Sequence, residues 1–252
     1  MIPNPIRKVL FSMRHHRVRC LLMGGQACVL YGAAEFSRDT DLAVLADSEN
    51  ERRLRLALCE LKAEVIAVPP FQREYLEEGL AVHFRCKHPE ANGMRVDVMS
   101  HMRGVAGFSA LWRRRTSLEM DDGMCCDLLS LPDLVKSKKT QRDKDWPMIR
   151  RLVEANYFSV LTHHKRPTKQ QLAFWLGELR TPELLVALAK SYPAETRQAA
   201  MRRTLLRHAI AGDSEVLSAA LDEEMQEERI RDQIYWEPLK RRLEQLRRHR
   251  VS

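Results

Sequence analysis

Three short segments decide how this chain folds: residues 21–26 (LLMGGQ), 36–42 (FSRDTDL) and 95–98 (RVDV). The first is an apolar run of the kind that forms a strand, and it ends at Gly24 and Gly25 before a helical pattern begins. Glycine lets the backbone approach an anion closely, and the amino end of a helix favours phosphate. This segment therefore predicts a strand, a glycine pair and a helix that together can approach a phosphate group.

The other two segments carry acidic residues on expected strands. Asp39 and Asp41 lie two residues apart, so both carboxylates project from the same face of a strand. Asp97 lies between Val96 and Val98, which face the opposite way. Three carboxylates on one face repel each other unless cations neutralise them, and Mg²⁺ combines carboxylate ligands with substrate phosphates. Two such ions about 3.5–4 Å apart can activate a hydroxyl and stabilise a leaving pyrophosphate. We therefore interpret the three aspartates as magnesium ligands.

The remaining elements of the first half follow from apolar alternation and turn residues. Ser48 is expected to cap a helix that runs to about residue 61. Turn residues at 88–93 and at Asp121-Asp122-Gly123 are each expected to close a hairpin. A helix is expected at residues 26–31, and strands at residues 18–23, 39–46, 63–68, 81–86 and 95–99.

The character of the chain changes after residue 130. Ser130 and Asp133 have the spacing of a capping box, which would open a basic helix extending from Lys136 to Lys144. From about residue 146 the pattern is helical to the end. Breaks are expected at Arg166-Pro167, Thr181-Pro182, Tyr192-Pro193, Gly212-Asp213 and Glu237-Pro238. We predict an α/β (α+β) domain over residues 1–155, with a small mixed sheet flanked by helices, and an all-α domain over residues 156–252.

Charge favours a polyanionic partner. The 252 residues contain 42 Lys and Arg against 34 Asp and Glu, a net charge of +8. This balance suits nucleic acid or nucleotide phosphates, although it is equally explained by general solubility. Basic tracts occur at residues 113–115 and from Lys240 to Arg250. The second tract could follow an RNA backbone, or it could dock as an amphipathic helix with its leucines inward.

Composition also limits the setting and the chemistry. The six cysteines show no metal-ligand spacing, which favours a reducing, cytoplasmic location. The doublets His15-His16 and His163-His164 have no evident partner ligands, so we interpret them as surface or core histidines. No apolar run approaches the roughly 18 residues of a membrane span. The basic amino-terminal stretch resembles a transit peptide, but it leads directly into the first expected strand. The motifs of P-loop, zincin and serine-hydrolase enzymes are absent from the sequence.

Taken together, these motifs resemble the DNA polymerase β-like nucleotidyltransferase superfamily, and within it the AbiEii-type group of toxin-like nucleotidyltransferases. Those proteins commonly show Gly-Gly-x-Ala and Ser/Thr-x-Asp-x-Asp-Leu, which residues 24–27 and 37–42 match. They also carry Asp-Leu-x-x-x-Lys followed by Arg-x-Lys-Asp, which residues 133–138 and 142–145 match. The resemblance covers roughly residues 18–155.

The resemblance implies a metal-dependent transfer of a nucleoside monophosphate from a triphosphate such as ATP to a hydroxyl. The acceptor could be an RNA end, a protein side chain or a small molecule. Under it, Asp39 and Asp41 bind Mg²⁺, and Asp97 is a third ligand or an activating base. The implied nucleotide-binding residues are Gly24, Gly25, Ser37 and Lys138, with Asp145 supporting the site.

The family resemblance also raises a toxin role with a cognate antitoxin protein. The sequence departs from the family in having Glu35 where an arginine is common and Met148 where a second aspartate is usual. The alternative function is a non-catalytic module that keeps the fold and binds nucleic acid or a partner protein.

Overall fold

The computed structural model describes residues 4–120, 123–162 and 166–251. The chain divides into two compact units. The first contains residues 1–30, 34–137 and 235–252, and the second contains residues 31–33 and 138–234. The boundary predicted after residue 155 falls inside a helix of the second unit. Within the described residues, no helix combines the length and apolar character that crossing a bilayer requires.

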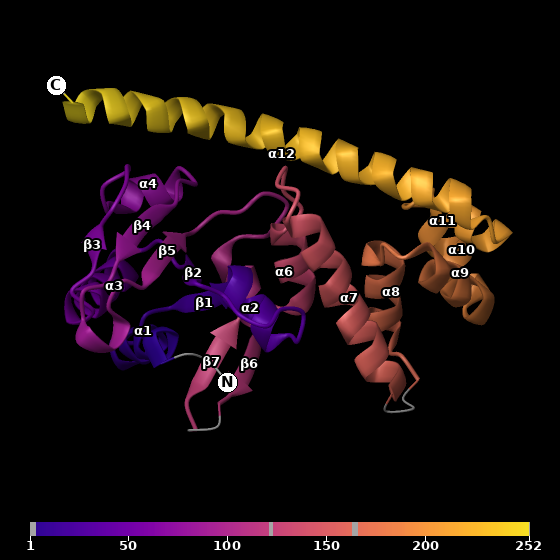
Figure 1. Cartoon of the computed structure of the whole chain (residues 1–252), viewed down its shortest axis with the longest axis horizontal. Helices are drawn as coiled ribbons and strands as arrows, with labels where there is room; N and C mark the ends of the chain where they lie inside the picture. The colour runs from indigo at the N-terminus through magenta and orange to yellow at the C-terminus, as the bar shows by residue number, and fades with distance from the viewer. Residues whose placement is uncertain (1–3, 121–122, 163–165, 252) are drawn as a thin grey trace. The chain divides into compact units, whose positions relative to one another are not determined.

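A seven-stranded mixed sheet forms the centre of the first unit (Figure 1). The spatial order of its strands is β3-β4-β5-β2-β1-β7-β6. β2 is antiparallel to β1 and parallel to β5, and these three adjacent strands lie in the middle of the sheet. The strands are β1 (Cys20–Met23), β2 (Asp39–Val44), β3 (Glu64–Val65), β4 (Val82–Arg85), β5 (Arg95–Met99), β6 (Thr116–Glu119) and β7 (Cys125–Leu128).

Helices pack around this sheet. α1 was not expected from the sequence; it buries Ile6, Val9 and Met13 and lies against α3. α2 packs against β1 and β2. The helices of this unit are α1 (Asn4–His15), α2 (Gly24–Leu30), α3 (Ser48–Glu60), α4 (Arg73–Glu77), the 3₁₀ turn η1 (Pro89–Ala91), α5 (Phe108–Arg113) and α6 (Leu131–Ser137).

Local predictions in the first unit hold with small corrections. The hairpin around residues 88–93 is confirmed, since β4 and β5 pair antiparallel with η1 between them. The N-cap of α3 is Asp47 and not Ser48, because the Asp47 carboxylate accepts the backbone N–H of Asn50. The strand expected at residues 63–68 shortens to Glu64–Val65, before the two prolines at 69 and 70, which lack the N–H that a ladder needs. β6 and β7 pair antiparallel, but Asp121 and Asp122 of the expected turn lie outside the described residues.

The continuous basic helix expected from Lys136 to Lys144 is wrong. Half of the expected capping box is seen, since the backbone N–H of Asp133 donates to Ser130 Oγ while the Asp133 carboxylate accepts from the Ser130 hydroxyl. α6 ends at Ser137, and residues 138–144 form a connecting loop. Tertiary contacts explain the difference, because the backbone N–H of Gln141 donates to the Asp232 carboxylate instead of to a helical carbonyl. The side chain of Thr140 likewise turns back to Asp145, the first residue of the next helix.

The second unit is helical throughout its described length. Its core includes the fully buried Trp175, whose ring lies 5.0 Å from the ring of Tyr157 and whose indole N–H donates to Asn156. The breaks expected at residues 166–167, 181–182, 192–193 and 212–213 separate its helices as predicted. The helices are α7 (Asp145–Thr162), α8 (Lys169–Glu178), α9 (Pro182–Ser191), α10 (Pro193–Ala200), α11 (Leu206–Ala211) and the first part of α12 (Ser214–Val251).

The break expected at Glu237-Pro238 is wrong, because the 38-residue α12 continues through Pro238. A proline removes one helical hydrogen bond, and two ion pairs lie close to this position. Glu237 and Arg241 form an ion pair of 3.0 Å along the helix. Arg242 pairs at 3.0 Å with Glu78, which follows α4 in the same unit.

A buried charge cluster stabilises the second unit. Glu224 on α12 accepts hydrogen bonds from Arg180 and Arg203, at 3.0 and 2.9 Å. Arg203 also donates to the backbone carbonyls of Leu176 and Leu179. Burial raises the pKa of Glu224, but the two guanidinium groups outweigh it and hold that pKa below the ordinary value. Because the folded pKa is depressed, this stabilisation is complete above the ordinary pKa of 4.5 and is lost as the pH falls through the folded value.

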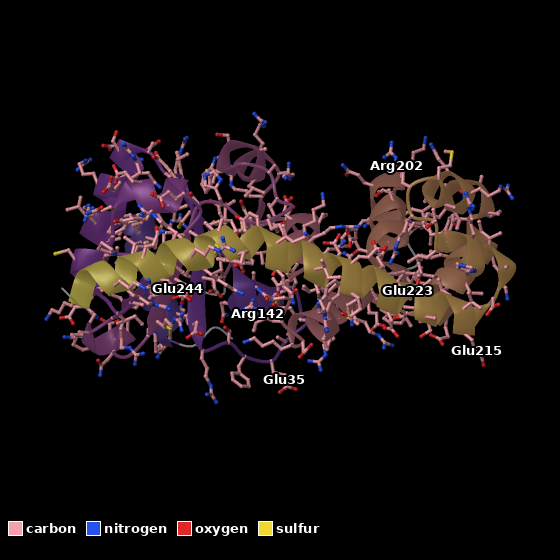
Figure 2. The ribbon with its side chains drawn as sticks, turned by 90° about the horizontal axis from the view of Figure 1, so that it is seen from above. Glu35, Arg142, Arg202, Glu215, Glu223 and Glu244 are labelled. Carbon is pink, nitrogen blue, oxygen red and sulfur yellow. The ribbon has the colours of Figure 1, made fainter. Side chains whose placement is uncertain are left out.

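We expect Glu224→Gln to lower the free energy of unfolding by on the order of 2–4 kcal/mol at neutral pH, because two largely buried arginines lose their counter-charge. Glu223→Gln is the matched control, since Glu223 is exposed on the same helix (Figure 2). Denaturant unfolding of both variants at pH 7 and pH 4 measures the difference. A loss of stability that is equal in the two variants would contradict the assignment.

Candidate active site

Strand register brings the three predicted aspartates to adjacent positions. β2 and β5 pair so that Asp41 lies opposite Asp97, and Asp39 lies opposite Arg95. On the other side of β2, Asp41 lies opposite Met23, the last residue of β1 before the glycine pair. Residues that alternate with them on β2 and β5 are buried, whereas the aspartates are half-buried. One face of the sheet thus carries a row of acidic side chains at the end of β1.

The carboxylate of Asp41 lies where a side chain on Gly24 would otherwise be. A Cβ atom on Gly24 would lie 1.8 Å from Oδ2 of Asp41, which is a steric clash. Gly24 also has a φ of +65°, which lies in the left-handed region that favours glycine. A Cβ on Gly25 would fall 2.6 Å from the hydroxyl oxygen of Ser37. The glycine pair therefore lets the backbone run directly against Asp41 and Ser37.

The loop before β2 is ordered by a side-chain contact. The Ser37 hydroxyl donates to the backbone carbonyl of Asp39 over 3.1 Å. Next to it, Phe36 is 66% exposed and the guanidinium of Arg38 lies 5.9 Å from its ring centroid. Glu35, which stands where the resembled family often has an arginine, is exposed on the outside of the molecule (Figure 2).

Two basic residues that the sequence did not single out contact Asp97. Arg95 Nε and His83 Nδ1 lie 2.8 and 2.9 Å from the same oxygen, Oδ1. Burial raises the pKa of Asp97, but the hydrogen bonds from His83 and Arg95 outweigh it and lower that pKa. Arg95 could have been found from its position two residues before Asp97 on one strand. His83 lies opposite Asp97 on β4, which only the register shows.

Arg95 partly neutralises the whole row. Its hydrogen bond to Asp97 raises the pKa of Arg95, and the charges of Asp97, Asp39 and Asp41 add to that effect. The guanidinium group of Arg95 therefore interacts electrostatically with all three carboxylates. The oxygens of these three carboxylates do not all lie within 4.8 Å of one another. Among the described residues, the potential metal ligands that do lie within this distance are His15, His16 and Glu60. The three carboxylates therefore lie side by side on the sheet without converging on one point.

The donor set fits Mg²⁺. Carboxylate oxygens are its preferred protein ligands, and it leaves room in its shell for phosphate oxygens. The absent Cβ of Gly24 leaves room for the Asp41 carboxylate itself, because Oδ2 of Asp41 would lie 1.8 Å from such a Cβ. Arg95 and His83 contact Oδ1 of Asp97, which orients that carboxylate in the row.

Lys138 and Asp145 lie together in the second unit. Lys138 is 8% exposed, and its ammonium nitrogen lies 3.4 Å from Oδ1 of Asp145. Thr140 and Arg142 contact the other oxygen, Oδ2, at 2.6 and 2.8 Å. Burial raises the pKa of Asp145, and Lys138, Thr140 and Arg142 together lower it. The Asp145 carboxylate therefore orients Lys138, and both residues are buried.

The neighbouring lysines differ from Lys138. Lys136 is exposed at the end of α6, and Lys139 forms a 2.7 Å ion pair with Glu178 in the second unit. Of Lys136, Lys138 and Lys139, Lys138 is thus the buried one. The sequence pattern alone did not distinguish these three lysines.

Comparison with models of known protein families gives no match for this chain, and comparison with curated protein sequences gives no significant match. What the site can do is therefore judged from its own residues.

Substitution of Gly24 tests the contact with Asp41. We expect Gly24→Ala to lose the left-handed conformation at a cost of about 1–2 kcal/mol and, in addition, to displace the Asp41 carboxylate. Gly32→Ala is the matched control, because Gly32 has a φ of +74° but nothing within 4 Å of its Cβ position. Thermal unfolding and calorimetric titration with Mg²⁺ and ATP measure the two effects. Equal losses in both variants would show that backbone strain alone matters.

Proposed function

We propose that this protein is a magnesium-dependent nucleotidyltransferase that transfers a nucleoside monophosphate from a nucleoside triphosphate to a hydroxyl acceptor. The proposal includes the nucleotidyltransferase fold of the DNA polymerase β-like superfamily. The observation that supports it best is the row Asp39, Asp41 and Asp97, placed by strand register directly beside Gly24. An acidic row packed against a glycine backbone suits a metal-bound triphosphate more than it suits a structural role.

Asp39, Asp41 and Asp97 would bind the magnesium ions. When bound, Mg²⁺ supplies charge stabilisation to the triphosphate and acidifies a coordinated hydroxyl. In the reaction, the acceptor oxygen bonds to the α-phosphorus, and the bond from that phosphorus to the bridging oxygen breaks. The hydroxyl proton passes to solvent, and pyrophosphate leaves.

The residues of the chain divide these tasks. Gly24 and Gly25 let the backbone lie close to the Asp41 carboxylate and the Ser37 hydroxyl, so that their backbone N–H groups would lie near a triphosphate held by the acidic row. Asp97 suits the role of a ligand better than that of a base, since its lowered pKa makes it a weak proton acceptor. The resemblance would assign Lys138 to the triphosphate as a point charge, and within the second unit Lys138 pairs with Asp145.

The acceptor that we favour is an RNA end, because the chain has a net charge of +8. A toxin role with an antitoxin partner, in a cytoplasmic setting, belongs to the same proposal. The alternative is a non-catalytic module that binds nucleic acid or a partner protein. The acidic row argues against it, because three like charges on one face are costly to retain without a use.

The central test replaces the metal ligands. Asp39→Ala and Asp41→Ala should each lower transfer by about a thousandfold or more, because charge stabilisation by bound metal is worth several kcal/mol. The assay incubates the full chain and Mg²⁺ with each labelled nucleoside triphosphate and total RNA, and follows transfer of label to RNA or to protein.

Glu119→Gln is the control for this test, since Glu119 is an exposed acid on the edge strand β6. It should retain full transfer. If either aspartate variant transferred nucleotide at nearly the wild-type rate, Asp39 and Asp41 would not be the metal ligands. Absence of transfer by the wild-type protein with every nucleotide would favour the non-catalytic alternative.

The end of α12 separates a docking face from a basic face. Tyr235, Leu239 and Arg242 are half-buried, and they reach Gly79, Glu78 and Tyr75 in the same unit. The docking interpretation of this segment is therefore supported within the first unit. Among the side chains described up to residue 248, the exposed basic residues of this segment are Lys240, Arg241, Arg247 and Arg248.

Replacing these four exposed residues by glutamine tests RNA binding without disturbing the docked face. If they contact the RNA backbone, the slope of log affinity against log salt should fall by up to about 3, because each contact releases condensed counterions. Fluorescence anisotropy with single-stranded RNA over a salt series measures this. Binding of the isolated nucleotide should stay constant, and an unchanged slope would exclude the tract from RNA contact.

A further inference from the structure

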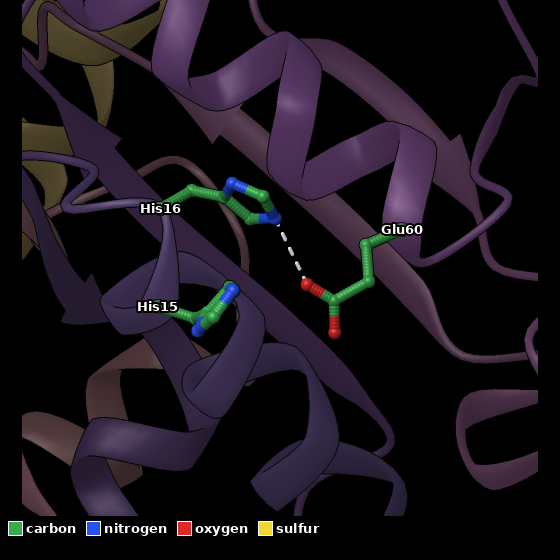
Figure 3. A group of neighbouring side chains, drawn as sticks. All are labelled: His15, His16 and Glu60. Carbon is green, nitrogen blue, oxygen red and sulfur yellow. Dashed lines mark hydrogen bonds and ion pairs between the residues drawn. The ribbon is translucent and has the colours of Figure 1, made fainter.

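A group of potential metal ligands lies at the ends of α1 and α3. His15 is the last residue of α1, His16 follows it, and Glu60 is the last residue of α3. One ligand atom from each of the three lies within 4.8 Å of the others. Figure 3 shows the two imidazole rings and the carboxylate gathered at this point. The sequence had left His15 and His16 without partner ligands, because Glu60 lies 44 residues away from His16.

The carboxylate is held with one oxygen toward the histidines. His16 Nε2 lies 2.9 Å from Oε2 of Glu60. The other oxygen, Oε1, accepts from the Lys8 ammonium over 2.6 Å and from the Ser12 hydroxyl over 2.8 Å. Partners of this kind, placed behind a ligand, fix its orientation in protein metal sites. Glu60 is thus oriented by Lys8 and Ser12, and Oε2 remains on the side of the imidazoles.

The His15 ring is also positioned by neighbours. It stacks on Phe11, one turn earlier in α1, with ring centroids 5.9 Å apart and an interplanar angle of 13°. The His16 ring meets it edge to face at 4.9 Å. His15 is exposed, so its nitrogens are accessible to an ion from solvent.

We propose that His15, His16 and Glu60 bind a zinc-type divalent transition metal as a three-ligand site separate from the acidic row. Two imidazoles and one carboxylate are ligands that Zn²⁺ takes in tetrahedral sites, with a fourth position for water. Mg²⁺ prefers oxygen ligands, so the two sites select different cations. The site shares no residue with Asp39, Asp41 and Asp97, and it does not depend on the proposed function.

Occupancy of this site would link the end of α1 to the end of α3. These helices already pack against each other, and His16 and Glu60 provide one ion pair between them. A metal bond to both ends adds a cross-link that exists only in the folded state. Binding should therefore raise the melting temperature.

Zinc binding by the full-length chain tests the proposal. The measurements use a Cys59→Ser, Cys125→Ser background, because these two exposed thiols could bind Zn²⁺ themselves. Isothermal titration calorimetry with Zn²⁺ should show one saturable site per chain, and Zn²⁺ should raise the melting temperature. His15→Ala should weaken the affinity by about tenfold or more and remove the thermal shift, because one of three ligands is lost.

His101→Ala is the matched control, since His101 is an exposed histidine of the same unit outside the group. Glu60→Gln supplies a second ligand variant that keeps the side-chain shape. Retained zinc affinity in both His15→Ala and Glu60→Gln would overturn the site, as would the absence of saturable micromolar binding in the background protein. Mg²⁺ in place of Zn²⁺ should give no thermal shift through these residues.

Discussion

The contact between the backbone of Gly24 and the carboxylate of Asp41 constrains the centre of the fold. For that contact to form, β1 and β2 must pair antiparallel with Met23 opposite Asp41. A shift of one residue would move the acidic side chains to the buried face of the sheet, because side chains alternate along a strand. The same register sets Asp41 opposite Asp97 on β5. One close approach thus connects the glycine pair, the central strands and the candidate site.

Charge balance is the second constraint, and the protein meets it differently in its two units. In the first, Arg95 and His83 hold Asp97, while the acidic row as a whole keeps a negative balance at the end of β1. In the second, Arg180, Arg203 and Glu224 lie where water is largely excluded, and each charge needs a partner there. Both units bury ionic groups, and in each unit arginines supply the counter-charge to the carboxylates.

The two candidate cation sites differ in ligand chemistry. The acidic row offers only oxygen donors on three neighbouring strand positions, with Arg95 as a local counter-charge. The group at the ends of α1 and α3 offers nitrogen as well, and its carboxylate is already oriented by Lys8 and Ser12. Hard oxygen ligands suit a catalytic ion that exchanges with its nucleotide, whereas imidazoles suit a more permanent ion.

The local features of this protein follow from short stretches of its amino-acid sequence. Alternation along residues 39–41 and 95–99 placed Asp39, Asp41 and Asp97 on strand faces, and the bounds of β5 matched the prediction. Proline and glycine positions located the helix breaks at residues 166–167, 181–182, 192–193 and 212–213. These features depend on backbone conformations that a few neighbouring residues set, so the local pattern suffices to find them.

Contacts between residues far apart in the chain became visible in the folded protein alone. The tertiary structure placed His83 beside Asp97 through the β4–β5 register, and it brought Glu60 to the histidine doublet. It also opened the loop at residues 138–144, where Asp232 takes the backbone N–H of Gln141. These contacts join residues many positions apart, and their energy depends on how helices and strands pack. Local periodicity carries no information about that packing, so the partner of each side chain appears only in the folded chain.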